Sequence, residues 1–400
     1  MLIRNLEIPI KRYMSEYPVI AIVGPRQSGK TTLARYMFPE HKYLSMENLD
    51  LRKKAEEDPR GFLDDYQANL ILDEVQRVPQ LFSYLQERVD LNDSPASYVL
   101  TGSQQFLLME KITQSLSGRI ITFKLFPFTV TELFNAKPDI DIDSIFKIKP
   151  DNILNPEKID INSLIFSGMF PRIHDKKLDA RKWIENYILT YIERDIRSLV
   201  NVDNLRVFEN FIKACAASAG QLVNYTSISN MIGTSLPTVK KWISLLETSG
   251  IVFLLQPYHK NFNKRLVKTP KLYFTDTGIV SYLLSIKNPD ELKNHPLYGN
   301  IFENFIISEI YKRISHTGEQ PPLFFWRDKT GNEIDLIVEK KELLPVEIKS
   351  SRTYNTSFSA PVSAWLALKG NEAEKGFIIY KGDDIHGKNT PVATLPWWVL

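Results

Sequence analysis

Cysteine is nearly absent from this sequence. The 400 residues contain a single cysteine, Cys215, which excludes an intramolecular disulfide and a zinc site made of several cysteines. It lies in a mostly apolar stretch, where a buried thiol is expected. No apolar run approaches the roughly 20 residues that a membrane-spanning helix needs, and the first residues lack the basic-then-apolar order of a signal peptide. We therefore expect a cytoplasmic protein without membrane attachment.

An excess of charge of one sign is also missing. The 50 basic and 47 acidic side chains leave a net charge of only +3, so any nucleic-acid-binding surface would have to be a local basic cluster. The hydrophobic fraction of 43% and charged fraction of 24% are typical of a folded, soluble protein. Because 400 residues exceed one ordinary core, two or three domains are expected.

The strongest motif is a glycine-rich loop between a predicted strand and a predicted helix. Residues 24–31 read G-x-x-x-x-G-K-T, after the apolar run 17–23 and before the helix-prone run 32–38. In such a loop, backbone N–H groups and the helix N-terminus face phosphate oxygens. A lysine at this position reaches the β- and γ-phosphates, and the following threonine binds Mg²⁺. The predicted nucleotide-binding residues are Gly24, Gln27, Ser28, Gly29, Lys30, Thr31 and Thr32.

Two acidic residues end another predicted strand. The apolar residues 70–72 run into Asp73 and Glu74, and parallel sheets place their ligands at the carboxyl ends of strands. Asp73 is expected beside the phosphate loop, where it would hold Mg²⁺ directly or through water. Glu74 would orient or deprotonate the attacking water. The alternative is a pair of solvated acids at a strand end.

The next predicted strand, residues 97–102, ends in small polar groups. Ser103 or Gln104 would contact the γ-phosphate or the water, and the sequence does not decide between them. Arg119 precedes the predicted strand 120–125 and is interpreted either as an arginine finger, which stabilises charge on the transferred phosphoryl group, or as a surface ion-pairing residue. A ring of subunits would let it act in trans. Five strands with intervening helices predict a doubly wound parallel sheet.

Four segments in the first third of the chain resemble those of a known protein family. Residues 23–32, 70–76, 100–104 and 117–128 resemble the prokaryotic AAA+-type P-loop ATPases that carry a conserved C-terminal region of unknown function. The resemblance covers roughly the whole chain, with the most specific motifs in this part. It implies ATP as the nucleotide but no particular substrate.

The middle of the chain is less informative. Residues 136–160 have no clear period and are expected to form a loop or insertion, and helical patterning returns over residues 178–200. In an ATPase of this class these helices would form a lid. Arg194 or Arg197 would then sense nucleotide, the alternative being that they are solvated or ion-paired.

Residues 206–287 have the order of a winged-helix domain. Two predicted short helices, 224–233 and 236–247, precede a β-ribbon that starts near residue 250 and carries Lys260, Lys264, Arg265 and Lys268. Base or phosphate contacts in this fold come from the front of the second helix. The candidate DNA-binding residues are Thr238, Lys240 and Lys241. The alternative is a packing or oligomerisation module.

In the last part of the chain, three acidic residues and a lysine lie on successive predicted elements. After a linker expected at 288–300, a helix carries Glu303, one strand carries Asp335, and the next carries Glu347 and Lys349, which are two apart and share a face. Two carboxylates can hold Mg²⁺ while a lysine helps to activate water, and Glu303 would complete the ligand set. This layout resembles the PD-(D/E)xK nuclease fold, with Ile334 where the proline would stand. Such domains can also bind without cleaving.

The predicted fold class is thus α/β. A P-loop NTPase core with a doubly wound parallel sheet occupies residues 1–135, and an insertion and helical lid occupy 136–205. A winged-helix domain (206–287) and a small restriction-endonuclease-like α/β domain (288–400) follow. We expect an ATP-binding, Mg²⁺-dependent ATP hydrolase that couples nucleotide state to DNA binding or processing. The alternative is an ATP-dependent switch that binds DNA or a protein and has a silent nuclease-like domain. A homo-oligomer is left open.

Overall fold

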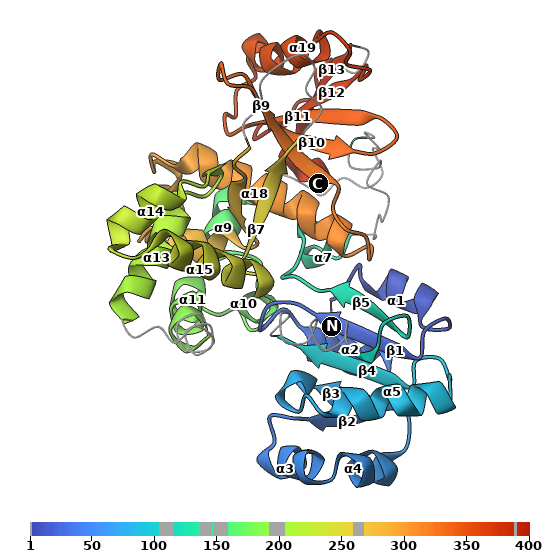
Figure 1. The fold of residues 1–400 in the computed structure, drawn as a ribbon. Helices are drawn as coiled ribbons and strands as arrows, with labels where there is room; N and C mark the ends of the chain where they lie inside the picture. The colour runs from blue at the N-terminus through green and yellow to red at the C-terminus, as the bar shows by residue number, and fades with distance from the viewer. Residues whose placement is uncertain are drawn as a thin grey trace. The chain divides into compact units, whose positions relative to one another are not determined.

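The computed structural model describes residues 2–103, 115–136, 146, 159–191, 205–258, 268–387 and 390–400. These form two compact units (Figure 1). The first unit comprises Met1–Phe128, Thr248–Gly250 and Ile314–Glu319; the second comprises Thr129–Glu247, Ile251–Arg313 and Gln320–Leu400. The predicted boundaries at 135/136, 205/206 and 287/288 all fall inside the second unit.

The first unit is built on a five-stranded sheet with the order β2-β3-β4-β1-β5. All neighbouring strands in it are parallel. The strands are β1 (Val19–Val23), β2 (Lys42–Ser45), β3 (Leu70–Asp73), β4 (Tyr98–Gly102) and β5 (Ile120–Lys124). The three central strands are buried along their whole length, as expected of a parallel sheet covered on both faces. The predicted parallel α/β core is confirmed.

Helices cover both faces of this sheet. Along β1, Val19, Ala21 and Val23 belong to one apolar cluster, whereas Ile20 and Ile22 belong to another, because successive strand residues point to opposite faces. The first cluster includes side chains of α4 and α5, and the second includes side chains of α1 and α2. The helical elements are α1 (Glu7–Tyr13), α2 (Lys30–Met37), α3 (Leu49–Glu57), α4 (Pro59–Tyr66), the 3-10 turn η1 (Val75–Arg77) and α5 (Leu81–Leu91).

The second unit contains an eight-stranded mixed sheet with the order β13-β12-β11-β10-β9-β7-β8-β6. Its strands are β6 (Gln221–Leu222), β7 (Val252–Pro257), β8 (Lys271–Phe274), β9 (Leu323–Arg327), β10 (Glu333–Glu339), β11 (Leu343–Lys349), β12 (Gly376–Tyr380) and β13 (Val392–Pro396). A short parallel pairing of β7 with β9 makes the sheet continuous. The expected β-ribbon of the winged helix, β7 with β8, therefore shares one sheet with the strands of the C-terminal part.

Along the chain of the second unit, helices lie before, between and after these strands. They are α7 (Val130–Leu133), α9 (Ile161–Ser167), α10 (Pro171–Asp175), α11 (Ala180–Tyr187), α13 (Leu205–Ala217), α14 (Tyr225–Ile232), α15 (Leu236–Thr248), α16 (Thr277–Leu283), α17 (Pro289–Lys293), α18 (Tyr298–Ser315), α19 (Ala360–Leu366) and the 3-10 turns η5 (Thr356–Ser359) and η6 (Trp397–Val399). Helices α13 to α15 followed by β7 and β8 have the expected order, but a winged-helix domain stays a prediction. The expected linker at 288–300 is wrong, because it contains α17 and the start of α18.

Candidate functional site

The loop between β1 and α2 has the backbone that its glycines allow. Gly24, Gln27 and Gly29 have positive φ angles of 150°, 63° and 97°. A Cβ atom on Gly24 would lie 2.1 Å from the carbonyl oxygen of Leu125, so no side chain fits there. Gly29 immediately precedes α2, so the free N–H groups of the first turn of the helix face the loop. This curled loop ending at a helix N-terminus is suited to an anion.

Lys30 is buried at this loop. Its Nζ donates hydrogen bonds to the carbonyl oxygens of Gly24 (3.0 Å) and Pro25 (2.8 Å). Burial lowers the pKa of Lys30 to about 8, against the opposing influence of Glu74 and Asp73. The ammonium is thus desolvated and would gain from a bound anion.

The Ser28 hydroxyl is a second group of this loop that is able to hydrogen-bond a ligand. Its side chain is fully buried, and among the described residues its Oγ has no hydrogen-bond partner. A buried hydroxyl without a partner is costly, and a phosphate oxygen would satisfy it. Gln27 and Thr32 are exposed, at positions that an incoming ligand can reach. The residues present therefore fit the phosphates of a nucleotide.

Asp73 lies at the same edge of the sheet as the phosphate loop. Asp73 pairs with Thr101 and Val23 pairs with Gly102, so the carboxyl ends of β3, β4 and β1 are level. Thr31 Oγ1 donates to Asp73 Oδ1 at 2.9 Å. Thr101 Oγ1 also donates to Oδ1, and the Tyr43 hydroxyl donates to Oδ2 at 2.8 Å. Mg²⁺ prefers oxygen ligands, so Thr31 and Asp73 fit that ion.

Glu74 follows in a left-handed conformation, with φ 53°. Its Oε2 accepts hydrogen bonds from Ser103 Oγ (2.9 Å), from Ser103 N (3.3 Å) and from Gln76 Nε2 (2.5 Å). Of the two polar candidates after β4, Ser103 thus contacts the acid, whereas Gln104 lies outside the described residues. The carboxylate of Glu74 is held in one position by neighbours on two elements.

Arg119 lies at the other end of the strands. It precedes β5, and its carbonyl oxygen accepts from the N–H of Val19, the first residue of β1. The phosphate loop begins after Val23, roughly 13 Å further along β1 at about 3.3 Å per residue. The Arg119 guanidinium instead forms a two-bond ion pair with Asp90, with Nη2 to Oδ2 at 3.0 Å. An arginine-finger role within the same chain is therefore wrong, and a role in trans stays a prediction.

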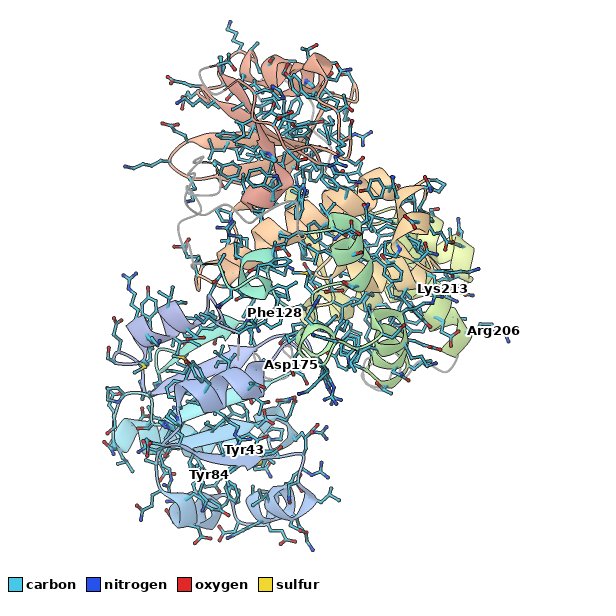
Figure 2. The ribbon with its side chains drawn as sticks, turned by 180° about the vertical axis from the view of Figure 1, so that it is seen from behind. Tyr43, Tyr84, Phe128, Asp175, Arg206 and Lys213 are labelled. Carbon is cyan, nitrogen blue, oxygen red and sulfur yellow. The ribbon has the colours of Figure 1, made fainter. Side chains whose placement is uncertain are left out.

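Four residues of the site were not predicted from the sequence: Tyr43, Gln76, Thr101 and Arg4. Tyr43 lies on the first unit, as Figure 2 shows. The buried Arg4 donates from Nη1 to Ser28 O (2.8 Å) and from Nη2 to Phe126 O (2.7 Å), and so supports the phosphate loop. Thr101 could have been inferred by aligning β3 and β4 at their ends. No local pattern indicates Arg4, which acts on a loop far along the chain.

The candidate DNA-binding residues lie on the front of α15. The Thr238 hydroxyl is 2.7 Å from Ser235 Oγ, so it takes part in the start of the helix. Lys240 and Lys241 are exposed, and Lys240 Nζ lies 5.7 Å from the ring centroid of Tyr225. Further along the expected ribbon, Lys268 is exposed. The candidates outside the described residues are Arg194, Arg197, Lys260, Lys264 and Arg265.

The predicted nuclease residues lie together in the second unit, as part of a carboxylate cluster formed by Glu303, Glu333, Asp335 and Glu347. Asp335 Oδ2 accepts from the N–H of Ile348 at 2.8 Å, and Lys349 Nζ lies 2.5 Å from Glu347 Oε1. Burial, helped by Asp335, raises the pKa of Glu303 to about 7 and that of Glu347 to about 8.

Lys271, which was not predicted from the sequence as a site residue, lies within this cluster. Lys271 Nζ lies 3.0 Å from Glu303 Oε1 and 2.5 Å from Glu333 Oε1. Within the ranges that the structure describes, no group of three or more His, Cys, Asp or Glu side chains could hold a metal ion. The predicted Mg²⁺ ligand set of Glu303, Asp335 and Glu347 is therefore not present in this arrangement, in which the Lys271 ammonium contacts Glu303.

Comparisons with known families divide the chain into three ranges. Residues 16–134 match the model of an AAA domain. Residues 158–290 and 298–399 match two domains of unknown function, DUF8612 and DUF4143. The chain is also similar to uncharacterized proteins of Mycobacterium bovis and Mycobacterium tuberculosis, at 26% identity over 98% of this chain and 83% of each relative.

A likeness to a solved structure concerns a Walker-type ATPase of Pyrococcus abyssi. It is 14% identical, has a TM-score of 0.44, and covers 70% of this chain and 94% of that one. Among the described residues, no helix is long and apolar enough to cross a membrane. The residues that match the AAA domain model, 16–134, thus contain both the phosphate loop and the acidic strand end described above.

Proposed function

We propose that the first unit binds ATP with Mg²⁺ and hydrolyses it. The observation that carries this proposal is the contact between Thr31 Oγ1 and Asp73 Oδ1, 2.9 Å apart. It brings the end of the phosphate loop and the acidic strand end to one place, as a P-loop hydrolase requires. The AAA domain match supports ATP as the nucleotide.

Each residue has a separate role in this proposal. Lys30 pairs with the β- and γ-phosphates, and the loop N–H groups and Ser28 hydroxyl donate to phosphate oxygens. Thr31 and Asp73 hold Mg²⁺, which when bound neutralises charge on the phosphates. Glu74 orients the attacking water and accepts its proton, while Ser103 and Gln76 keep the Glu74 carboxylate in position.

The test separates binding from hydrolysis. Glu74→Gln keeps the shape of the side chain but removes the base, so we expect it to bind ATP and to lose steady-state phosphate release by about 100-fold or more. The matched control is Glu87→Gln, because Glu87 is a surface carboxylate of α5 paired with Arg60. Normal phosphate release by Glu74→Gln would remove Glu74 from the mechanism.

We also propose that nucleotide state is coupled to DNA binding through α15. The exposed Lys240 and Lys241 support this function, because paired lysines near the front of such a helix can contact phosphates. Phosphate release is measured with single-stranded, duplex and branched DNA. We expect one form to stimulate the wild type, and the Lys240→Ala, Lys241→Ala double variant to lose that stimulation and to bind DNA with a shallower salt dependence.

A protein-binding switch is the alternative for the whole chain. Absence of stimulation by every DNA form would favour it. Metal-dependent DNA cleavage by the second unit is not part of the proposal, because Lys271 contacts the predicted metal ligands. A homo-oligomer in which Arg119 completes a neighbouring site and a cytoplasmic location both stay predictions.

A further inference from the structure

We propose that Lys271 is the resident cation of the carboxylate cluster and that it keeps divalent metal ions out of this site. The cluster then forms a latent metal site, which becomes available only when the Lys271 ammonium is removed. The inference concerns the second unit and does not depend on ATP hydrolysis by the first.

The position of Lys271 is central to the argument. It is the first residue of β8, and only 3% of it is exposed. Its Nζ lies 3.0 Å from Glu303 Oε1, 2.5 Å from Glu333 Oε1 and 4.0 Å from Asp335 Oδ1. A buried ammonium needs opposite charges around it. These three carboxylates supply them from α18 and β10.

The backbone that carries Lys271 is tied down beside the cluster. Strand β8 pairs with β7 on one side and with β6 on the other. The side-chain amide of Asn304 accepts from Phe274 N and donates to Phe274 O, both at 2.8 Å, which joins β8 to α18 next to Glu303. The lysine is therefore held where it is by hydrogen bonds of the main chain and not only by its own ion pairs.

Several oxygens of the cluster already accept hydrogen bonds. Glu303 Oε1 accepts from the Tyr273 hydroxyl at 2.6 Å in addition to Lys271. Asp335 Oδ2 accepts from the backbone of Ile348 at 2.8 Å. Ions such as Mg²⁺ need about six ligands at close range, so an ion at this cluster would have to compete with Lys271 and Tyr273 for Glu303 Oε1.

The charge balance leads to the same conclusion. Besides Lys271, Arg327 pairs with Glu333 at 3.0 Å and Lys349 pairs with Glu347 at 2.5 Å. Three cationic side chains thus face four carboxylates, which leaves little negative charge to attract a divalent ion.

One buried oxygen of the cluster accepts no hydrogen bond among the described residues. Glu347 is 5% exposed, and its Oε2 has no hydrogen-bond partner among the described residues. A single oxygen does not hold a divalent ion. If the Lys271 ammonium were absent, oxygens of Glu303 and Asp335 would join it, and the site would have three carboxylates from three elements. Lys271 is therefore the group that decides whether this cluster binds metal.

The experiment is a titration of the nucleotide-free, full-length protein with Mn²⁺, followed by the electron paramagnetic resonance signal of the free ion. Lys271→Met removes the ammonium and keeps a side chain of similar length, whereas Lys271→Arg retains the charge. We expect Lys271→Met to gain one Mn²⁺ site at the cluster that the wild type lacks. Adding Glu347→Gln should remove that site, which distinguishes it from any binding at Asp73.

Three results would overturn the proposal. One is a wild-type Mn²⁺ site that Glu347→Gln abolishes, since the metal would then bind in the presence of Lys271. This measurement needs no Lys271 variant, so it stands even if Lys271→Met does not fold. The second is a Lys271→Met protein with a wild-type circular dichroism spectrum that binds no Mn²⁺ at the cluster. Gain of the site by Lys271→Arg would likewise contradict a role for the positive charge.

Discussion

At the scale of single residues, the first unit surrounds one carboxylate with three hydroxyl groups. Thr31, Thr101 and Tyr43 all donate to Asp73, so both of its oxygens are held before any ligand arrives. Groups that orient a metal ligand affect metal affinity without touching the metal. We therefore expect residues outside the motif to tune the site.

Tyr43 offers a direct test of this arrangement. Burial, together with the hydrogen bond to Asp73, raises the pKa of Tyr43 to about 12, so the phenol stays a donor across the usual pH range. Tyr43→Phe should raise the Mg²⁺ concentration needed for half-maximal phosphate release about tenfold and leave metal-free ATP binding unchanged. Tyr84→Phe, a partly buried tyrosine of the same unit (Figure 2), is the control. Equal Mg²⁺ requirements in the two variants would contradict the orienting role of Tyr43.

We expect Lys30 to make nucleotide binding pH-dependent. Burial lowers its pKa to about 8 in the free protein, and a bound phosphate favours the charged form. Above about pH 8 the lysine must take up a proton to pair with phosphate, so affinity should fall as the pH rises, by up to about tenfold per pH unit. Isothermal titration with ATP without Mg²⁺, from about pH 7 to about pH 9.5, measures this. In Lys30→Met the affinity should be weak and independent of pH over the same range. A wild-type affinity that does not change would contradict the depressed pKa.

At the scale of elements, the ends of helices show what a local pattern can and cannot indicate. Helix α3 ends just before Pro59, and Pro59 begins α4, with the Asp58 side chain accepting from Gly61 N. Similarly, Asn288 caps α17 and Pro289 is its first residue. Proline both stops one helix and starts the next, so the expected linker at 288–300 was wrong for a reason that was visible in the sequence.

The position of Arg119 at a strand end predicts its role. Because Arg119 lies at the amino end of β5 and pairs with Asp90, we expect Arg119→Ala and Asp90→Ala to keep phosphate release within about twofold of wild type, as for an ordinary surface ion pair. Measurements at several protein concentrations include any oligomer that forms. Loss of release in Arg119→Ala alone, at concentrations where subunits associate, would instead support an arginine finger acting in trans.

At the scale of the whole molecule, the two units have separate cores and separate chemistry. The first has two apolar clusters, one on each face of its parallel sheet, and the second has its own cluster around Trp326 and Trp365. Two independent cores commonly unfold as separate transitions.

Calorimetry can assign these transitions. In Glu74→Gln, which preserves bound ATP, MgATP should raise the midpoint of one transition and leave the other unchanged. At a hundred times the dissociation constant the stabilisation is about 2.7 kcal/mol. Lys30→Met is the control that should show no such shift. A single transition that moves as a whole in MgATP would mean that the two units unfold together.

The sequence by itself determined the features that depend on neighbouring residues. The phosphate loop follows from the fixed spacing of Gly24, Gly29 and Lys30, and the acidic strand end follows from three apolar residues before Asp73. The parallel sheet follows from short, continuous apolar runs, because strands buried on both faces need them. Each of these signals is contained in about ten consecutive residues.

Only the tertiary structure decided which distant residues meet. The contacts of Arg4 with the phosphate loop and of Tyr43 with Asp73 depend on strand order and register, which no local residue pattern encodes. The same holds for Lys271, whose position among the carboxylates follows from the packing of β8 against α18. Contacts between segments far apart in the chain are set by how whole elements pack, so a single sequence names the chemical groups but not their neighbours.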